Sequence, residues 1–193
     1  SGIGPEIILK SVVETKLNNF VVFGDSLVFD SLIKNLRLPF TINKLSEISE
    51  AVFEEGYINL FETSKLNYLP HYGRISKECG KVSFDAIIKS IELAKQGKVS
   101  GIVTAPISKK ALNLAHINYP GHTEILAGYS NNKAVSMMLL NKHIKTVLVT
   151  LHCSMKQALD RITIQNELDA IINANLGCKL CLLYTSPSPR NKA

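Results

Sequence analysis

Apolar residues recur at intervals of three and four between residues 76 and 96, and this spacing predicts one long amphipathic helix. Ser76 is a suitable N-cap, because its hydroxyl can accept a hydrogen bond from a backbone N–H that has no partner within the helix. Gly97 suits the position just past the helix, where a left-handed backbone conformation is common. The apolar positions on one face are Phe84, Ile87, Ile88, Ile91 and Ala94.

Short apolar runs bounded by polar or turn residues predict strands. These runs cover residues 20–23, 40–45, 57–61, 101–103, 134–140 and 144–151. Helices are expected between several of them, with Pro5 in the first turn of one and Asp25 or Ser26 at the start of another. Two further helices are expected at residues 154–162 and 163–176. Strands that alternate with helices are typical of an α/β fold.

The order of the predicted elements changes after residue 112. Strands and helices alternate before it, whereas two consecutive strands follow a turn at Pro120-Gly121. We therefore expect residues 1–112 to form a first α/β domain and residues 113–176 to begin a second one. The composition changes again at residues 177–193, which we interpret as a non-native tail; a native linker rich in proline and serine is the alternative.

Composition and charge narrow the choice of partner. The 193 residues are 46% hydrophobic, which suits a chain with a genuine core, and their formal net charge is +6. Basic residues are scattered along the chain, whereas a nucleic-acid surface normally shows a clustered basic stripe. No apolar run reaches the roughly 18 residues that a membrane span needs, and no secretory signal is visible. We therefore expect a cytoplasmic protein that binds neither nucleic acid nor membranes.

Polar side chains gather just past the predicted strand at residues 101–103. Pro106 ends that strand because it has no N–H to donate. Thr104, Ser108 and Lys109 then lie beyond a strand end, which is where α/β sheets bind ligands. Lys109 could hold a phosphate or, with a lowered pKa, accept a proton.

Two histidines stand in positions that suit chemistry. His122 and Thr123 are adjacent in a turn and could hold a phosphate or a hydroxyl group, and Thr123 could also cap the helix that follows. His152 ends the run 144–151 and could present a neutral ring nitrogen to a metal ion. The alternative for each is a structural residue whose polar groups are satisfied within the fold.

Four motifs together resemble one enzyme family. They are Gly2-Ile-Gly-Pro-Glu6, Thr104-Ala-Pro-Ile-Ser-Lys109, Tyr119-Pro-Gly-His-Thr-Glu124 and Thr150-Leu-His152. Their order and spacing over residues 1–176 are similar to those of the 4-hydroxythreonine-4-phosphate dehydrogenases. The resemblance implies a fold like that of isocitrate and isopropylmalate dehydrogenases. Such a fold has two α/β domains, of which the second is incomplete here, and an active site in the cleft that is completed across a homodimer.

The resemblance also implies a reaction. The family oxidises 4-phosphohydroxy-L-threonine with NAD(P) to a 3-oxo acid, which loses carbon dioxide to give 3-amino-2-oxopropyl phosphate for pyridoxal 5′-phosphate synthesis. By the resemblance, His122 and Thr123 contact the small phosphorylated substrate. His152 is then one of three ligands to a divalent metal, which would be Zn, Co or Mg. A catalytic role for Lys109 is our own hypothesis.

The sequence also departs from the family pattern. A Gly-Asp-Pro-Ala stretch before Gly2 is absent, as are the segments that supply the other two metal ligands and the downstream phosphate contacts. We therefore expect a fragment that is inactive by itself. Two other functions stay open: a dehydrogenase of the same family that acts on 4-phosphoerythronate or phosphothreonate, and a non-catalytic α/β module that binds phosphorylated ligands.

Overall fold

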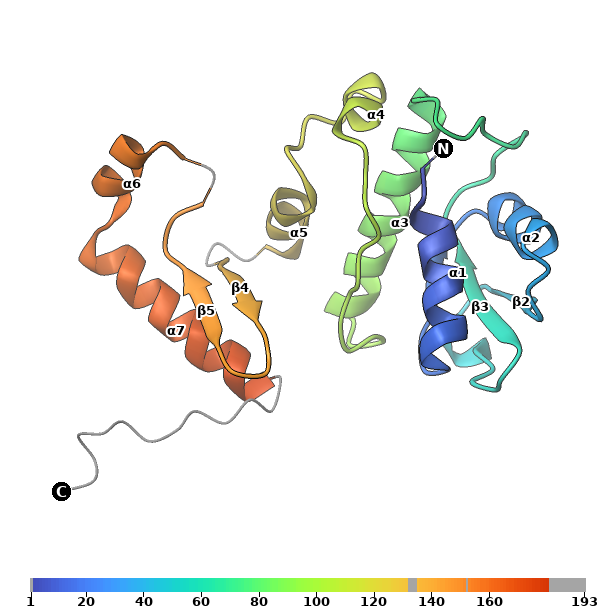
Figure 1. The fold of residues 1–193 in the computed structure, drawn as a ribbon, viewed down its shortest axis with the longest axis horizontal. Helices are drawn as coiled ribbons and strands as arrows, with labels where there is room; N and C mark the ends of the chain where they lie inside the picture. The colour runs from blue at the N-terminus through green and yellow to red at the C-terminus, as the bar shows by residue number, and fades with distance from the viewer. Residues whose placement is uncertain (1, 132–134, 152, 181–193) are drawn as a thin grey trace. The chain divides into compact units, whose positions relative to one another are not determined.

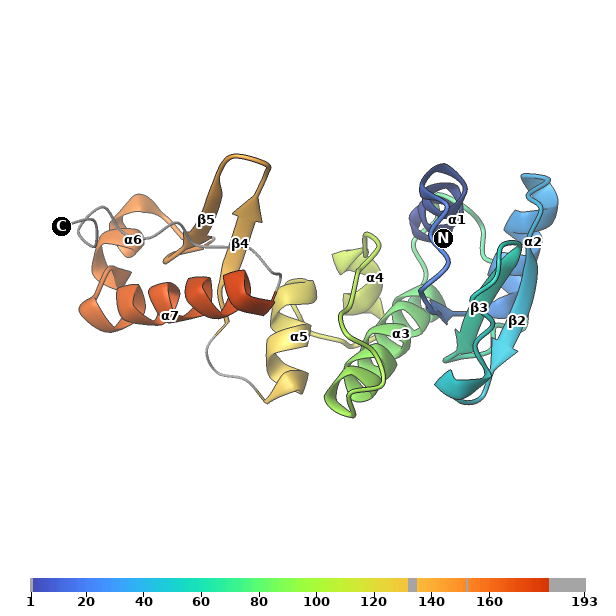
Figure 2. The same ribbon diagram turned by 90° about the horizontal axis from the view of Figure 1, so that it is seen from below.

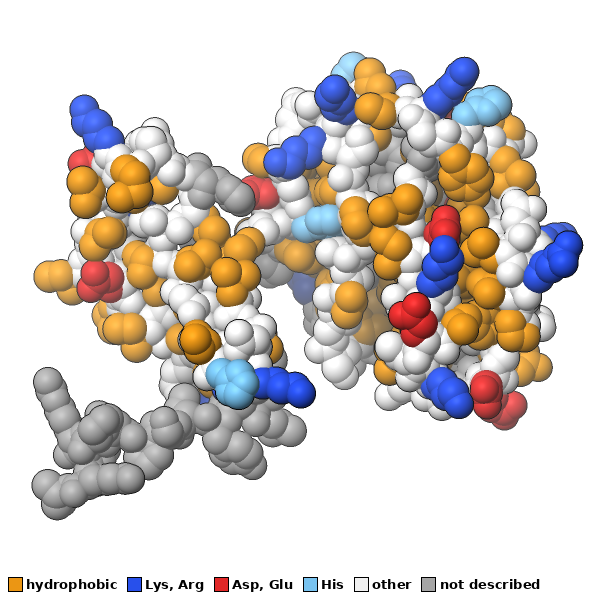
Figure 3. Space-filling view, viewed as in Figure 1, with side chains coloured by type: hydrophobic (Ala, Val, Ile, Leu, Met, Phe, Trp, Pro, Cys, Tyr) orange, Lys and Arg blue, Asp and Glu red, His pale blue; other side chains and the backbone are white. Residues whose placement is uncertain are grey.

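The computed structural model describes residues 2–131, 135–151 and 153–180 of a mixed α/β chain (Figures 1 and 2). The chain divides into two compact units, Ser1–Asn131 and Asn132–Ala193. Both units show apolar and charged side chains on the face drawn in Figure 3. No helix among the described residues is long and apolar enough to cross a membrane.

The first unit is built on a three-stranded parallel sheet in the order β1-β3-β2. Ile42 of one edge strand lies opposite Ile58 of the central strand, and Val22 of the other edge strand lies opposite Leu60. Helix α2 connects β1 to β2, which lie on opposite edges of the sheet and both run parallel to β3. The strands are β1 (Val22–Gly24), β2 (Thr41–Leu45) and β3 (Tyr57–Glu62), and the helix is α2 (Ser26–Asn35).

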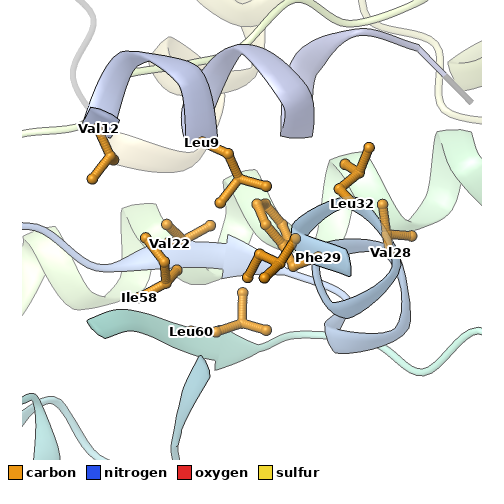
Figure 4. Packing of buried hydrophobic residues seen from close by; sticks show 9 residues of the cluster. Leu9, Val12, Val22, Val28, Phe29, Leu32, Ile58 and Leu60 are labelled. Atoms are coloured by element: carbon orange, nitrogen blue, oxygen red, sulfur yellow. The ribbon is translucent and has the colours of Figure 1, made fainter. Parts of the chain in front are cut away.

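Helices α1 (Gly4–Thr15) and α2 bury their apolar faces against this sheet. Figure 4 shows Leu9 and Phe29 from the two helices turned toward Leu60 of β3. Asp25 caps α2 as predicted, because its Oδ1 accepts hydrogen bonds from the N–H groups of Leu27 and Val28. These residues confirm the strands and the capped helix expected for this part of the chain.

A second core lies between α3 (Lys77–Lys95), α4 (Lys109–Leu114) and α5 (His122–Ser130). Its members are the buried side chains of Ile87, Ile91, Leu112 and Ile125. The long helix is confirmed together with both of its ends. The Ser76 hydroxyl accepts a hydrogen bond from Cys79 N at 3.2 Å, and Gly97 has a φ of 70°.

The boundary expected after residue 112 stays a prediction about the domains of the complete protein. The two compact units divide instead between Asn131 and Asn132, because α5 packs on α3 and so belongs to the first unit.

The strand predicted at residues 101–103 is wrong. This segment pairs with none of the described strands, and the Val103 side chain is 100% exposed. Only Ile102 packs against the second core. One partly buried side chain is enough to hold this segment against the helices. A strand also needs a neighbouring strand for its backbone groups.

The second unit contains the two consecutive strands and the two helices expected there, and the strands pair as an antiparallel hairpin. β4 (Met137–Leu140) pairs with β5 (Lys145–Leu148), and the Asn141 side chain accepts hydrogen bonds from the backbone N–H groups of His143 and Ile144. Helices α6 (Met155–Arg161) and α7 (Ile164–Leu180) follow, and α7 packs on β5.

The interpretation of residues 177–193 as a non-native tail stays a prediction. Helix α7 continues through Leu180, and the Cys178 side chain is only 9% exposed. Ala170 and Cys178 are both buried and lie eight residues apart, so they share one face of the helix. The first residues of this stretch therefore belong to α7, and residues 181–193 lie outside the described part of the chain.

Candidate functional site

Two of the four motifs lie against each other in the first unit. A Cβ placed on Gly4 would lie 3.2 Å from Cβ of Ala105 and 3.7 Å from the carbonyl oxygen of Pro106. Gly4 itself is buried. The Gly-rich start of α1 and the Thr-Ala-Pro segment, about a hundred residues apart in the sequence, are therefore neighbours.

Helix α4 holds the end of the Thr-Ala-Pro segment. The Ser108 hydroxyl accepts a hydrogen bond from Ala111 N at 3.3 Å and so caps the helix. The backbone of α4 also approaches α3 closely, because a Cβ on Gly80 would lie 2.1 Å from the Ala111 carbonyl oxygen. Lys109, in the first turn of α4, is exposed and forms no ion pair within the described residues. Its side chain is thus available to an anionic ligand.

Helix α5 begins with residues of the third motif. Its N-cap is Gly121, which has an extended backbone (φ 179°) and provides no side-chain hydrogen bond. The expected capping role of Thr123 is wrong, because Thr123 lies inside the first turn rather than before it. The first N–H groups of an uncapped helix, together with the helix dipole, favour an anion or a negatively charged oxygen.

The His122 ring is the polar group at this position that has no partner. Its Nε2 is buried and makes no hydrogen bond within the described part of the structure. Burial lowers the pKa of His122, and the Ala105 backbone, which accepts a hydrogen bond from the ring, opposes this shift. Since the ordinary pKa of histidine is about 6.5, the ring is mainly neutral at pH 7. A buried nitrogen without a partner is rare in native structures and is explained by a ligand or water that supplies one.

The loop between β3 and α3 approaches the start of α1. The pKa of Tyr72 is raised, first by burial and second by the negative charge of Glu6. Tyr72 is otherwise half exposed to solvent. Residues 63–76 form no helix or strand, and this loop borders the same Gly-rich motif.

The described residues do not supply the predicted metal site. His152 lies outside them, and no group of three or more His, Cys, Asp or Glu side chains that could hold a metal ion occurs among the residues that are described. The structure thus brings the Gly4 loop, the Ala105 segment and His122 together. The part played by His152 remains a prediction.

One polar cluster was missed by the sequence interpretation. The Ser26 hydroxyl donates a hydrogen bond to Glu62 and accepts one from Lys44 Nζ at 2.9 Å. The hydrogen bond from Ser26 lowers the pKa of Glu62, and the charges of Lys44 and Lys65 lower it further, while burial opposes them. All three residues of this cluster lie at or near the carboxyl ends of parallel strands. The available signal was Glu62, a carboxylate that directly follows the apolar run 57–61.

Comparison with known proteins finds relatives in one enzyme family. A family model described as pyridoxal phosphate biosynthetic protein PdxA matches residues 16–187. A 4-hydroxythreonine-4-phosphate dehydrogenase from Beijerinckia indica is 44% identical over 180 residues, which are 93% of this chain and 53% of the relative. A Fusobacterium nucleatum protein provisionally named D-threonate 4-phosphate dehydrogenase is 35% identical over 176 residues, covering 89% of this chain and 53% of that protein.

A solved structure also matches. It is described provisionally as a 4-hydroxythreonine-4-phosphate dehydrogenase from Salmonella typhimurium, and it superposes with a TM-score of 0.86 at 31% identity. The match covers 92% of this chain and 56% of that one. The chain therefore spans about half the length of the curated relatives it matches. From the family match over most of its length and the 44% identity, the chain belongs to the PdxA family of pyridoxal phosphate biosynthetic proteins.

Proposed function

We propose that the protein acts in a dehydrogenase that oxidises 4-phosphohydroxy-L-threonine with NAD(P) in the synthesis of pyridoxal 5′-phosphate. The observation that supports this most directly is the buried, unpaired Nε2 of His122 at the uncapped start of α5. The Beijerinckia indica relative carries the name of this activity.

In this proposal His122 and Thr123 bind the substrate. A neutral imidazole offers one acceptor and one donor, so it can pair with a substrate hydroxyl as well as with a phosphate oxygen. The first-turn N–H groups of α5 add donors at the positive end of the helix dipole, which suits the charge of the phosphate. Lys109, which is exposed at the start of α4, adds a positive charge for the same anion or accepts the hydroxyl proton.

The chemistry is a hydride transfer followed by loss of carbon dioxide. The hydride leaves the carbon that carries the hydroxyl group and reduces the nicotinamide, while the hydroxyl proton passes to a base. The 3-oxo acid then loses its carboxylate as carbon dioxide, and the enolate that remains takes up a proton to give the amino ketone. A divalent metal (Zn, Co or Mg), with His152 as one ligand, would supply Lewis-acid stabilisation of the reacting oxygens. We further propose the two-domain architecture of the isocitrate dehydrogenases and a homodimeric assembly for the complete protein.

A second candidate substrate is D-threonate 4-phosphate, because the Fusobacterium nucleatum relative is provisionally named for it. Both substrates carry a phosphate and a secondary hydroxyl group, so His122 and Thr123 would serve either one. They differ where one has an amino group and the other a hydroxyl group.

Calorimetric titration of the chain with each of the two substrates tests the binding site. We expect His122→Ala to weaken the binding of the true substrate, whereas His143→Ala, at an exposed turn of the second unit, should leave it unchanged. Reduction of NAD or NADP with added Zn, Co or Mg then identifies the reaction. Tight binding that is insensitive to His122→Ala would contradict the proposed site, and binding without turnover in the complete protein would favour a non-catalytic module.

A further inference from the structure

We propose that Gly4 is a positioning residue for His122, because a residue without a Cβ lets Ala105 lie where its backbone contacts the imidazole. The proposal rests on the role in substrate binding proposed above for His122. It concerns the orientation of the ring and not contact between Gly4 and the substrate.

The first step is the contact between Gly4 and Ala105. A Cβ on Gly4 would come within 3.2 Å of the Ala105 Cβ, which is closer than side-chain carbon atoms normally approach. The new methyl group would also lie 3.7 Å from the carbonyl oxygen of Pro106. Any other residue at position 4 therefore displaces the chain at Ala105 by a few tenths of an ångström.

The second step links Ala105 to the ring. The Ala105 backbone accepts a hydrogen bond from His122, and Nε2 is buried and unpaired within the described structure. An acceptor that is fixed in position selects which ring nitrogen carries the proton, because the partner of one nitrogen sets the tautomer of the other. Moving Ala105 changes both the tilt of the ring and the balance of its tautomers.

The third step explains why Ala105 cannot simply relax away. The far end of the segment is fixed where the Ala111 carbonyl oxygen packs on Gly80 of α3. Ser108 caps α4 at the same end, and the ring of Pro106 restricts the backbone in between. At the near end, Ile102 packs against the second core. A segment held in these two places transmits a displacement at Ala105 to the His122 ring instead of absorbing it.

The test compares Gly4→Ala with two matched controls. Gly2→Ala adds a methyl group in the same loop, and Gly101→Ala adds one before the same segment; a Cβ at either position meets no atom within 4 Å. The readout is the pair of imidazole ¹⁵N chemical shifts of His122, which distinguish the two neutral tautomers. We expect one dominant tautomer in the parent and in both controls, and a mixture in Gly4→Ala.

A compensating variant separates positioning from a general loss of structure. In Gly4→Ala/Ala105→Gly the methyl group moves from one side of the contact to the other, so the clash disappears and the parent tautomer should return. Unchanged ¹⁵N shifts in Gly4→Ala would overturn the proposal. Equal changes in the controls, or a double variant that stays like Gly4→Ala, would overturn it as well.

Binding of 4-phosphohydroxy-L-threonine distinguishes this proposal from the proposed function. We expect Gly4→Ala to weaken binding about fivefold, since displacements well below 1 Å already reduce productive alignment. A tautomer change in a protein that binds neither candidate substrate would support positioning and contradict the proposed function. Weaker binding with an unchanged tautomer would contradict positioning alone.

Discussion

The two compact units differ in how far they bury their apolar side chains. In the first unit several large side chains are fully buried, among them Leu9, Ile58 and Leu60. In the described part of the second unit only Ala170 and Cys178 are buried hydrophobic residues, and Ile164 of α7 is 89% exposed. Burial of a large side chain contributes about 1.5–3 kcal/mol, so the first unit gains far more from its core. Similar proportions of apolar residues can therefore give a stable first unit with a buried core and a second unit whose apolar side chains lie on the surface, available for contact.

The largest expected effect comes from removing a buried leucine. Leu9→Ala should destabilise the first unit by about 2–5 kcal/mol, because it opens a cavity beside Phe29 and Leu60. Leu168→Ala, on α7 where the side chain is 46% exposed, should cost less than about 1 kcal/mol. Native-state hydrogen exchange read at Leu60 and Val147 reports the two units separately. Equal costs in both would remove the distinction between them.

Adding a methyl group inside a helix sharpens the same comparison. Gly80→Ala should cost about 1–3 kcal/mol, because the new Cβ meets the rigid backbone of α4. Gly177→Ala meets only the flexible end of Met138, at 3.0 Å, and should be neutral or stabilising by up to about 1 kcal/mol from helix propensity. Thermal unfolding followed by circular dichroism measures both. A tolerated Gly80→Ala would show that the contact between α3 and α4 is loose.

The dependence of folding stability on pH should originate in the first unit. Burial lowers the pKa of His122, so the unfolded chain binds its proton more readily than the folded one. The contribution of this group to stability is complete above about pH 6.5, the unfolded pKa, and is lost as the pH falls toward the folded pKa. His122→Gln cannot titrate and should flatten the stability profile between pH 7 and pH 5. A variant with an unchanged slope would mean that the ring is hydrated.

The smallest effect concerns the cluster at the carboxyl ends of the strands. Ser26→Ala removes the hydrogen bond that contributes most to lowering the pKa of Glu62, so this pKa should rise toward its ordinary value. Ser31→Ala in the same helix is the control, because Ser31 does not contact Glu62. Carboxyl ¹³C titration by NMR measures the change. An unchanged Glu62 pKa in Ser26→Ala would assign the shift to Lys44 and Lys65 instead.

Local interactions were the part of the fold that the sequence predicted well. Ser76 and Asp25 cap their helices through hydrogen bonds that span only two or three residues, and the pattern of α3 repeats over five turns. The strand predicted at residues 101–103 failed because three apolar residues do not specify a neighbour for their backbone. Thr123 failed as a cap because the extended Gly121 starts the helix earlier.

The candidate site was predicted only in part, since its contacts are tertiary. The motifs identified His122 and the segment around Ala105 as candidates. Whether these two parts come into contact depends on the helical structure between them in the chain. Gly4 and Gly80 have no Cβ, and this allows a neighbouring segment to approach closely. No pattern of side chains in the sequence reveals such a contact. A glycine inside the long α3 helix was nevertheless a usable signal, because glycine weakens a helix unless packing requires it.

The central position of β3 has a consequence for the order in which the first unit folds. Among the described strands, β1 and β2 each pair with β3 alone, and the partner of Val22 is Leu60, 38 residues further along the chain. During synthesis on the ribosome, β1 and β2 therefore cannot pair with β3 until residues 57–62 have left the exit tunnel. Because pairing over such a separation carries the entropy of closing a long loop, the sheet should form late and in a single step. Helix α2, capped locally by Asp25, is free to form earlier and would be the first ordered surface on which the strands assemble.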